Sequence, residues 1–479
     1  MPQLIPFLGS IAICAFFASC VSSGARSPGN NSGNGIPLQP VSTTDPQNNF
    51  PPGEFDASKL VNWYAKPGNA WVLQNNPGEI YLYINIQSGQ PATEQPRVPL
   101  NISLVLDRSG SMEGEKIDYA RRAAKFLVDQ LSQDDYLSLV NYDDRVEVTS
   151  PSQPVKNKEA LKHAIDKITD RGSTNLSGGM LEGYSQAKQT RKDGYVNRVL
   201  LLTDGLANDG ITDPLELKRL VEKKYNAEGI ALSTFGLGAD YNEDLLTMLA
   251  ESGRANYYFI DSADKIPALF ARELKGLLSV VAQNALAQIS IPEGMQCEKV
   301  YGYPFEVKNG QVQVRFNDIY ANDEKAILIR LTSKTPVQKD LRFKCTLSYI
   351  DAQKFDPVNL EKQVTIKVTD NKTLIEKGQD STVQEMLALF ESTEQFDEMM
   401  ARVDKGDYDA ARSSGKAAIA VLKQKEQLYK SPKLKEQFNK MSSYLNNIDS
   451  VKTMEAAERK LFQKSSKSVN YEVKKQKKI

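Results

Sequence analysis

Between about residues 99 and 282 the sequence alternates short, uninterrupted apolar runs with amphipathic stretches of helical period. An apolar run without polar alternation is typical of a strand buried on both faces. Because successive parallel strands need a crossover connection, the pattern predicts a mostly parallel, doubly wound (Rossmann-like) α/β sheet with helices on both faces. The expected strands span residues 102–106, 136–140, 199–203, 230–236 and 257–260. The expected helices span residues 115–131, 157–168, 178–190, 213–225, 242–252 and 264–280.

The segments on either side of this α/β domain alternate apolar with polar residues, as half-buried antiparallel strands do. Residues 54–98 contain too few strands to fold alone, and residues 283–372 supply further strands of the same kind. We therefore predict one antiparallel β-sandwich with the α/β domain, residues 99–282, inserted into it.

Residues 378–470 show helical period and no strand pattern, which predicts a helical bundle or a pair of helical hairpins. Gly406 interrupts the first helix, Asp407 is a candidate N-cap of the next, and a third helix follows Pro432. Residues 471–479 form a basic tail, which we expect to be a solvated end. Contact of this tail with an anionic surface is the alternative.

The N-terminus has the features of an export signal. Residues 1–20 contain an apolar run too short to span a bilayer and end in small residues before Cys20, which resembles the bacterial lipobox. Ordinary signal cleavage, or a plain apolar N-terminus, is the alternative. Residues 21–53 are rich in Ser, Gly, Asn and Pro, which predicts a disordered tether. We therefore expect an exported protein of the cell envelope, lipid-anchored through Cys20 at the outer membrane or the cell surface.

The composition and the positions of the cysteines exclude several classes of binding partner, metal site and enzyme. Lys+Arg and Asp+Glu each number 60, so no global field attracts nucleic acid and we expect no nucleic-acid partner. The one histidine, His163, lies in a helical stretch where we expect it to face solvent, so no His-based triad or zinc site is expected. No Cys-x-x-Cys, P-loop or nucleophile elbow occurs, and we predict that the protein is not an enzyme. In an exported chain Cys297 and Cys345 are a candidate disulfide, with two small buried thiols as the alternative.

Three loops carry oxygen-bearing side chains at expected strand ends or helix starts. The run Asp-Arg-Ser-Gly-Ser at 107–111 follows the first strand, the run 172–179 precedes a helix, and Asp204 follows the third strand. Because the carboxyl ends of the strands gather at one edge of a doubly wound sheet, five side chains are expected to meet there. These are Asp107, Ser109, Ser111, Thr174 and Asp204. Two carboxylates and three hydroxyls suit a hard divalent cation, Mg²⁺ first, with Mn²⁺ or Ca²⁺ as alternatives. Each residue taken singly is also common in turns and N-caps, which is the alternative interpretation.

The three loops resemble the metal-ion-dependent adhesion site of von Willebrand factor A (VWA) domains, and the resemblance covers residues 99–282. It implies that Ser109 and Ser111 bind the metal directly, and that Thr174 binds it when a ligand is present. It also implies that Asp107 and Asp204 act largely through metal-bound waters. A VWA domain within β-structure is similar to the arrangements in integrin β chains and inter-alpha-trypsin-inhibitor heavy chains.

We therefore predict a membrane-tethered, divalent-metal-dependent protein-binding module for adhesion or assembly. In this interpretation, an acidic side chain of a protein partner fills an open coordination position on the metal. The alternative is a structural scaffold lipoprotein, in which the metal only stabilises the fold and the helical domain recruits partners.

Overall fold

The computed structural model describes residues 55–56, 59–91 and 97–476. The expected signal peptide with Cys20 and the whole of the expected tether lie outside the described residues. Among the residues that are described, no helix combines the length and the apolar character needed to cross a membrane.

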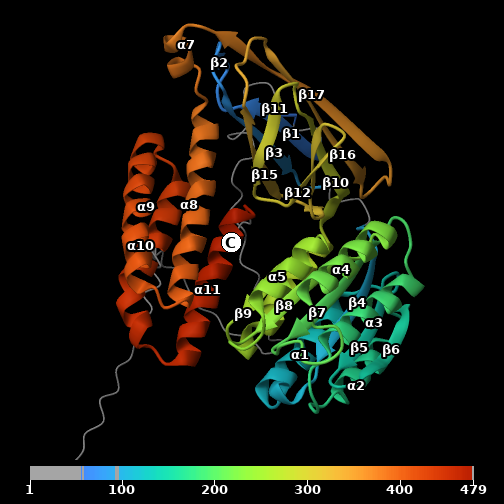
Figure 1. Cartoon of the computed structure of the whole chain (residues 1–479). Helices are drawn as coiled ribbons and strands as arrows, with labels where there is room; N and C mark the ends of the chain where they lie inside the picture. Colours follow the sequence, from blue (N-terminus) through green and yellow to red (C-terminus); the bar gives the residue numbers. More distant parts are fainter. Residues whose placement is uncertain (1–54, 57–58, 92–96, 477–479) are drawn as a thin grey trace, which may run out of the picture. The chain divides into compact units, whose positions relative to one another are not determined.

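The sheet of the α/β domain has the strand order β6-β5-β4-β7-β8-β9, and only β6 runs antiparallel to its neighbour (Figure 1). The strands are β4 (Leu100–Asp107), β5 (Tyr136–Tyr142), β6 (Val146–Pro154), β7 (Val196–Thr203), β8 (Ala231–Leu237) and β9 (Tyr257–Ile260). Every residue of β4, β7 and β8 is buried, as their continuous apolar runs predict. The edge strand β6 was not predicted, because serines and prolines interrupt its apolar pattern.

Helices cover both faces of this sheet. They are α1 (Glu115–Gln130), α2 (Lys158–Asp166), α3 (Leu176–Gln189), α4 (Pro214–Glu228), α5 (Glu243–Ser252) and α6 (Ile266–Leu277). Neighbouring strand residues belong to different cores: Leu104 packs with α1, α2 and α6, whereas Val105 packs with α3, α4 and α5. The doubly wound architecture is thereby confirmed. His163 is exposed on α2, as expected.

Strands from both sides of the α/β domain form two further sheets around one apolar core. One sheet has the order β1-β3-β15-β11, and the other has the order β12-β13-β10-β16-β17-β2 with β14 beside β10. The early strands are β1 (Val61–Pro67), β2 (Trp71–Leu73) and β3 (Glu79–Ser88). The late strands are β10 (Val280–Ser290), β11 (Met295–Tyr301), β12 (Phe305–Lys308), β13 (Gln311–Arg315), β14 (Ile319–Tyr320), β15 (Glu324–Ser333), β16 (Leu341–Asp351) and β17 (Pro357–Thr369). Because β3 pairs with β15 and β2 pairs with β17, the α/β domain is inserted into the β-structure, as predicted.

The two cysteines considered as a disulfide are free thiols. Cys297 lies on β11 and Cys345 lies on β16, and these strands belong to different sheets. Burial raises the pKa of Cys297 to about 11 and that of Cys345 to about 12. The structure therefore corresponds to the alternative of two separate thiols held in the protonated, unreactive form.

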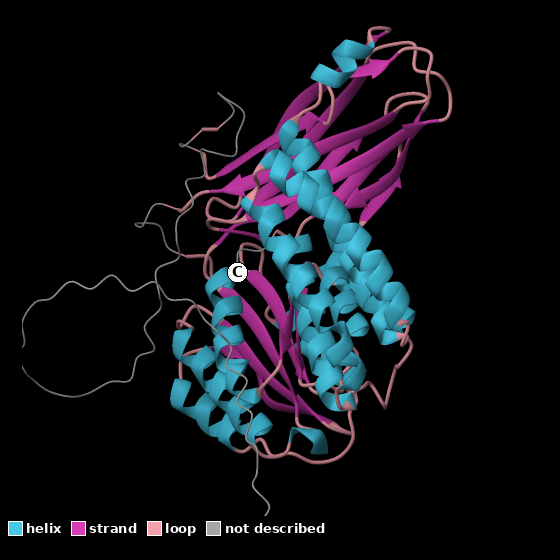
Figure 2. Cartoon of the chain, turned by 90° about the vertical axis from the view of Figure 1, so that its left-hand side faces the viewer, coloured by secondary structure: helices cyan, strands magenta, loops and turns pink. Residues whose placement is uncertain are grey.

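Helices follow the last strand. They are α7 (Lys372–Lys377), α8 (Ser381–Asp404), α9 (Tyr408–Tyr429), α10 (Pro432–Thr453) and α11 (Ala456–Lys474). Asp407 occupies the N-cap position of α9, but its side chain makes no capping hydrogen bond. The outer face of the four-stranded sheet packs against these helices, since Tyr64, Tyr83 and Leu328 share one core with residues of α8 to α10 (Figure 2).

The expected basic tail is largely part of the fold. Residues 471–474 are helical, because α11 runs to Lys474. Lys475 is buried, where its ammonium pairs with Glu251 at 2.7 Å and donates to the carbonyl of Gly302 at 2.9 Å. The prediction of a solvated end is therefore wrong at Lys475, since this cation has a carboxylate partner on α5 that the sequence pattern does not show.

Helix α11 also contacts the α/β domain. The Lys464 ammonium donates to the carbonyl of Tyr241 at 2.6 Å and lies over the same tyrosine's ring. The rings of Tyr257 and Tyr471 meet edge to face with centroids 5.8 Å apart. These contacts hold the C-terminal helix against the end of the domain formed by α5 and β9.

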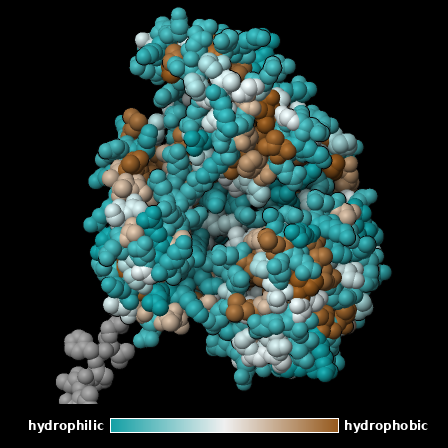
Figure 3. All heavy atoms as spheres, viewed as in Figure 1, coloured by the Kyte–Doolittle hydropathy of each residue, from teal (hydrophilic) through white to brown (hydrophobic). Residues whose placement is uncertain are grey.

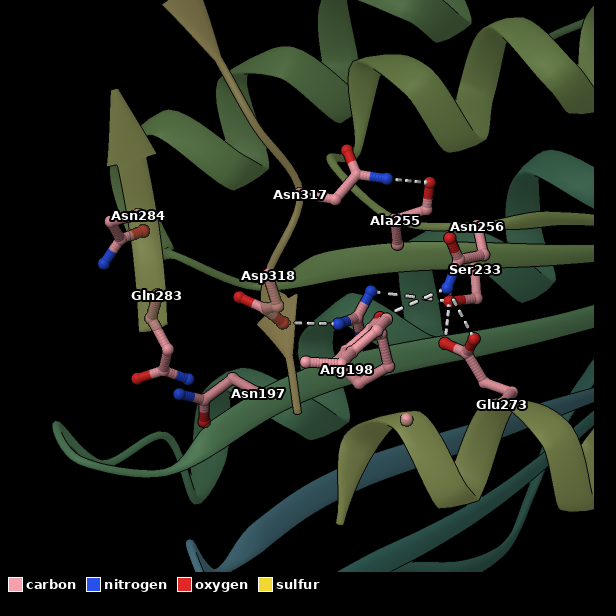
Figure 4. Close-up of polar contacts among 12 residues, drawn as sticks. Asn197, Arg198, Ser233, Ala255, Asn256, Glu273, Gln283, Asn284, Asn317 and Asp318 are labelled. Carbon is pink, nitrogen blue, oxygen red and sulfur yellow. Dashed lines mark hydrogen bonds and ion pairs between the residues drawn. The ribbon is translucent and has the colours of Figure 1, made fainter. Parts of the chain in front are cut away.

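A buried polar network joins the α/β domain to the segment between β13 and β14 (Figure 4). The Arg198 guanidinium, from β7, pairs with the Asp318 carboxylate at 2.6 Å and lies 3.4 Å from the Ser233 hydroxyl. Glu273 on α6 accepts hydrogen bonds from Ser233 at 2.5 Å and from Asn256 at 2.8 Å. The network therefore connects β7, β8 and the last helix of the domain with the β-sandwich.

Candidate metal site

The three loops with oxygen-bearing side chains lie at the carboxyl edge of the parallel sheet. Strands β4 and β7 are neighbours in parallel register, with Leu106 opposite Leu202, so Asp107 and Asp204 leave the same edge. Thr174 precedes α3, whose N-cap Asn175 accepts a hydrogen bond from the backbone of Gly178. The arrangement follows from the parallel order of the strands, as the sequence predicts.

The Asp107 carboxylate is held in one orientation by two short hydrogen bonds and a longer one, 3.4 Å, from the Tyr142 hydroxyl to Oδ2. Its Oδ1 accepts from the backbone N–H of Ser109 at 2.8 Å, and its Oδ2 accepts from the Thr203 hydroxyl at 2.6 Å. Burial raises the pKa of Asp107 to about 6, and the nearby negative charge of Asp204 adds to the rise. A cation bound beside Asp107 would therefore stabilise the ionised form of its carboxylate.

Hydrogen bonds link Ser109, Ser111 and Asp204, and Thr174 lies beside them. The hydroxyl oxygens of Ser109 and Ser111 lie 3.1 Å apart, and Ser111 donates to Asp204 Oδ1 at 2.7 Å. A Cβ added at Gly205 would lie 3.2 Å from the Thr174 hydroxyl, which places that hydroxyl against the turn after Asp204. The structure thus brings the five predicted side chains to one place.

Lys116, on the first turn of α1, belongs to this site although sequence reasoning missed it. Its ammonium lies 2.5 Å from Asp204 Oδ2 and 3.0 Å from the carbonyl oxygen of Ser111. The signal in the sequence is weak, because a lysine five residues after Ser111 reads as an ordinary helix-surface residue. In the structure the ammonium supplies a positive charge at the carboxylate of Asp204.

A second buried carboxylate, Asp143, fixes the loops around the site and was also missed. Its Oδ2 accepts from Arg108 at 2.7 Å and from Arg171 at 2.6 Å, and its Oδ1 accepts from the backbone of Arg145 at 2.7 Å. Burial alone raises the pKa of Asp143, but these donors together lower it below its usual value. Asp143 therefore stays ionised and ties the 107–111 loop to the loop before Thr174.

The donor set fits a hard divalent cation. Asp107 and Asp204 supply a formal charge of −2, and three hydroxyls supply neutral oxygen. The ammonium of Lys116 already pairs with Asp204 from within the chain. Within residues 55–56, 59–91 and 97–476, no group of three or more His, Cys, Asp or Glu residues is arranged to hold a metal. The candidate site is accordingly one of mixed carboxylate and hydroxyl ligands, which suits Mg²⁺ better than a thiolate or imidazole site would.

Comparison with known proteins identifies the α/β domain. Residues 101–272 match the family model of the von Willebrand factor type A domain. This segment is a VWA domain. In sequence, the Uncharacterized protein YfbK of Escherichia coli (strain K12) is 35% identical over 191 residues, covering 40% of this chain and 33% of that protein. Inter-alpha-trypsin inhibitor heavy chain H3 of Mus musculus is 31% identical over 252 residues, covering 50% of this chain and 26% of that protein.

A solved structure resembles more of the chain than the VWA domain alone. The von Willebrand factor type A protein from Catenulispora acidiphila has a TM-score of 0.63 at 14% identity, covering 79% of this chain and 91% of that one. At 14% sequence identity, this structural similarity shows that the two proteins share a fold. The chain spans only about a third of YfbK and about a quarter of the inhibitor heavy chain.

A cavity among the described residues lies away from the metal loops. It has a volume of about 620 Å³ and is lined by residues of α4, α5, α8 and α11, among them Glu243 and Lys467. Figure 3 shows mostly hydrophilic residues around the hollow between the C-terminal helices and the VWA domain. Burial raises the pKa of Glu243 to about 7, although Lys467 and Lys464 lower it. Burial also lowers the pKa of Lys464, which precedes the cavity residue Lys467 on α11, to about 8.

Replacing Glu243 by glutamine is expected to change the pH dependence of stability. A carboxyl whose pKa is higher in the folded protein loses stabilisation as the pH rises from its unfolded value through its folded value, here from 4.5 to about 7. Glutamine does not titrate, so Glu243→Gln avoids this loss. The free energy of unfolding of the variant minus that of wild type should therefore be about 2 kcal/mol larger at about pH 8 than at about pH 5. Urea unfolding at the two pH values measures it, with Asp134→Asn, an exposed carboxylate outside the cavity, as control. Equal pH slopes in wild type and Glu243→Gln would contradict the assignment.

Proposed function

We propose that the chain binds a protein partner through a divalent cation held by the VWA domain. VWA domains generally bind protein partners and are typically non-enzymatic interaction modules. The observation that carries the proposal is the convergence of three loops, in which Asp107, Ser109, Ser111 and Asp204 are linked by hydrogen bonds and Thr174 lies beside them.

In this proposal the ligands have different tasks. The hydroxyls of Ser109, Ser111 and Thr174 supply neutral oxygens, and Asp107 and Asp204 supply charge. Mg²⁺ is the expected ion, with Mn²⁺ or Ca²⁺ as alternatives, and when bound it offers an electrophilic position to an oxygen ligand. Because the direct ligands in this proposal are neutral hydroxyls and the two carboxylates act largely through metal-bound water, the ion stays electrophilic, and an acidic side chain of the partner suits its open position.

Capture of the partner on intact cells tests the proposal. Tagged wild-type chain is cross-linked in Mg²⁺, in EDTA, and after Mg²⁺ is restored, beside Thr174→Ala and the distant, exposed control Thr373→Ala. We expect one cross-linked species that disappears in EDTA, returns with Mg²⁺, and falls about tenfold in Thr174→Ala, which corresponds to about 1.4 kcal/mol. The melting temperature of each variant is measured in parallel, so that a folding defect in Thr174→Ala is recognised.

A scaffold role is the second candidate. Val421 and Leu428 are exposed on α9 seven residues apart, and therefore lie on one face of the helix. If the partner is still cross-linked in EDTA and by Thr174→Ala, and Mg²⁺ changes only the melting temperature, the result supports the scaffold role. The same result contradicts metal-dependent binding.

We also propose that Cys20 anchors the chain in the cell envelope, at the outer membrane or the cell surface. The support is the sequence pattern of small residues before Cys20 and the polar segment after it. Metabolic labelling with a fatty-acid analogue should mark wild type and not Cys20→Ala, and label in both variants would contradict the anchor.

A further inference from the structure

Lys116 forms an ion pair with Asp204, one of the two carboxylates of the proposed metal site. Asp204 Oδ2 receives the Lys116 ammonium at 2.5 Å, and Asp204 Oδ1 receives the Ser111 hydroxyl at 2.7 Å. The Asp204 side chain has no exposed surface, whereas the Lys116 side chain is 38% exposed. Both carboxylate oxygens are thus engaged from within the chain, one of them by a full positive charge.

The contact is built by the backbone rather than by a chance surface encounter. Gly114, with φ of 77°, lies at the N-cap of α1 and directs the chain from the 107–111 loop into the helix. Lys116 follows on the first turn of α1, from where its ammonium also donates to the carbonyl of Ser111 at 3.0 Å. A lysine at the N-terminal end of a helix is electrostatically unfavourable, because the helix dipole favours negative charge there. The buried carboxylate of Asp204 offsets this cost.

A divalent cation and the ammonium would act on the same carboxylate. Two positive charges close to one buried carboxylate repel each other, and the repulsion is stronger where water is excluded. The lysine side chain is long and flexible, and part of it already faces solvent, so it can leave the carboxylate without a change of fold. Metal binding should therefore require displacement of the ammonium.

We propose that Lys116 is a tethered competitor of the metal, neutralising Asp204 in the metal-free protein and setting the metal affinity of the site. The inference rests on the proposed function, because it assumes that a divalent cation binds at these loops. Two consequences follow. The metal-free site is stabilised by its own lysine, and the site fills only when the divalent cation is abundant enough to displace it.

Metal titration of three full-length variants tests the competitor role. Mg²⁺ and Mn²⁺ binding to wild type, Lys116→Gln and Lys116→Arg is measured by calorimetry. The matched control is Lys125→Gln, because Lys125 is on the same helix and pairs with a different carboxylate, Asp166, at 2.6 Å. Lys116→Gln should tighten metal binding about tenfold, Lys116→Arg should remain near wild type or weaker, and Lys125→Gln should not change it. The rise in melting temperature on adding metal should also be larger in Lys116→Gln than in wild type.

The outcomes separate the inference from the function on which it rests. Unchanged or weaker binding by Lys116→Gln, with clear binding by wild type, overturns the competitor role and makes Lys116 a positioning residue for Asp204. Binding by Lys116→Gln that wild type lacks at the same metal concentration supports both ideas. Binding by neither protein overturns the proposed metal site itself.

Discussion

Replacing Asp107 by alanine is expected to weaken Mg²⁺ binding by about 100-fold or more, which corresponds to about 2.7 kcal/mol. Asp107 contributes one of the two buried negative charges of the site and orders the backbone of Ser109 through a 2.8 Å hydrogen bond. Calorimetric titration of wild type and Asp107→Ala measures the loss. Asp118→Ala is the control, because this exposed carboxylate of the same region pairs with Arg121 outside the metal loops.

Asp107→Asn removes the charge of this side chain but keeps its size, and so separates an effect on metal binding from an effect on folding. Burial raises the pKa of Asp107 from 3.8 to about 6, so keeping this carboxylate ionised at neutral pH lowers the stability of the folded protein relative to the unfolded chain. Asp107→Asn should therefore be at least as stable as wild type without metal, and Mg²⁺ should raise the melting temperature of wild type only. A variant that binds Mg²⁺ as wild type does would remove Asp107 from the site.

Replacing Arg198 by methionine is expected to lower the free energy of unfolding by about 3–5 kcal/mol. The Arg198 side chain is entirely buried, and its loss leaves the Asp318 carboxylate without its ion-pair partner (Figure 4). Burial already raises the pKa of Asp318 despite the opposing charge of Arg198, so an unpaired carboxylate there is costly. Urea unfolding of wild type and variant side by side gives the difference.

Two further variants show whether the cost comes from the unpaired charge. Arg198→Met combined with Asp318→Asn should recover part of the stability, because fewer buried charges are left unmatched. Arg412→Met, which removes an ion pair with Asp449 on the surface of the helical region, should cost much less than Arg198→Met, because water screens the exposed pair. The account of the network is contradicted if Arg198→Met costs no more than Arg412→Met.

The sequence predicts those parts of the site that depend on strand order. Asp107 and Asp204 follow uninterrupted apolar runs, and parallel strands bring their carboxyl ends together whatever the details of packing. Lys116 could not be assigned in this way, because its reach depends on the backbone at Gly114 and on the direction of α1. Asp143 was missed for a similar reason, since its arginine partners come from two loops that are distant in sequence.

The alternation of apolar and polar residues in the sequence also could not predict details of the fold that depend on pairing between distant segments. Alternation showed that Cys297 and Cys345 lie in strands, but which sheet each strand joins is set by pairing partners elsewhere in the chain. The burial of Lys475 depends on Glu251, more than two hundred residues away. The insertion of the α/β domain was predictable because residues before and after it share one alternation and neither flank has enough strands alone.

The most direct test of the account is the location of Mn²⁺ in crystals of the full chain grown with that ion. An anomalous difference peak is expected at the edge of the sheet, within about 2.3 Å of the Ser109 and Ser111 hydroxyl oxygens and beside Asp204. The ammonium of Lys116 should then have left Asp204. A structure in which saturating Mn²⁺ gives no peak at these loops, or gives one only elsewhere, would contradict metal-dependent binding by this VWA domain.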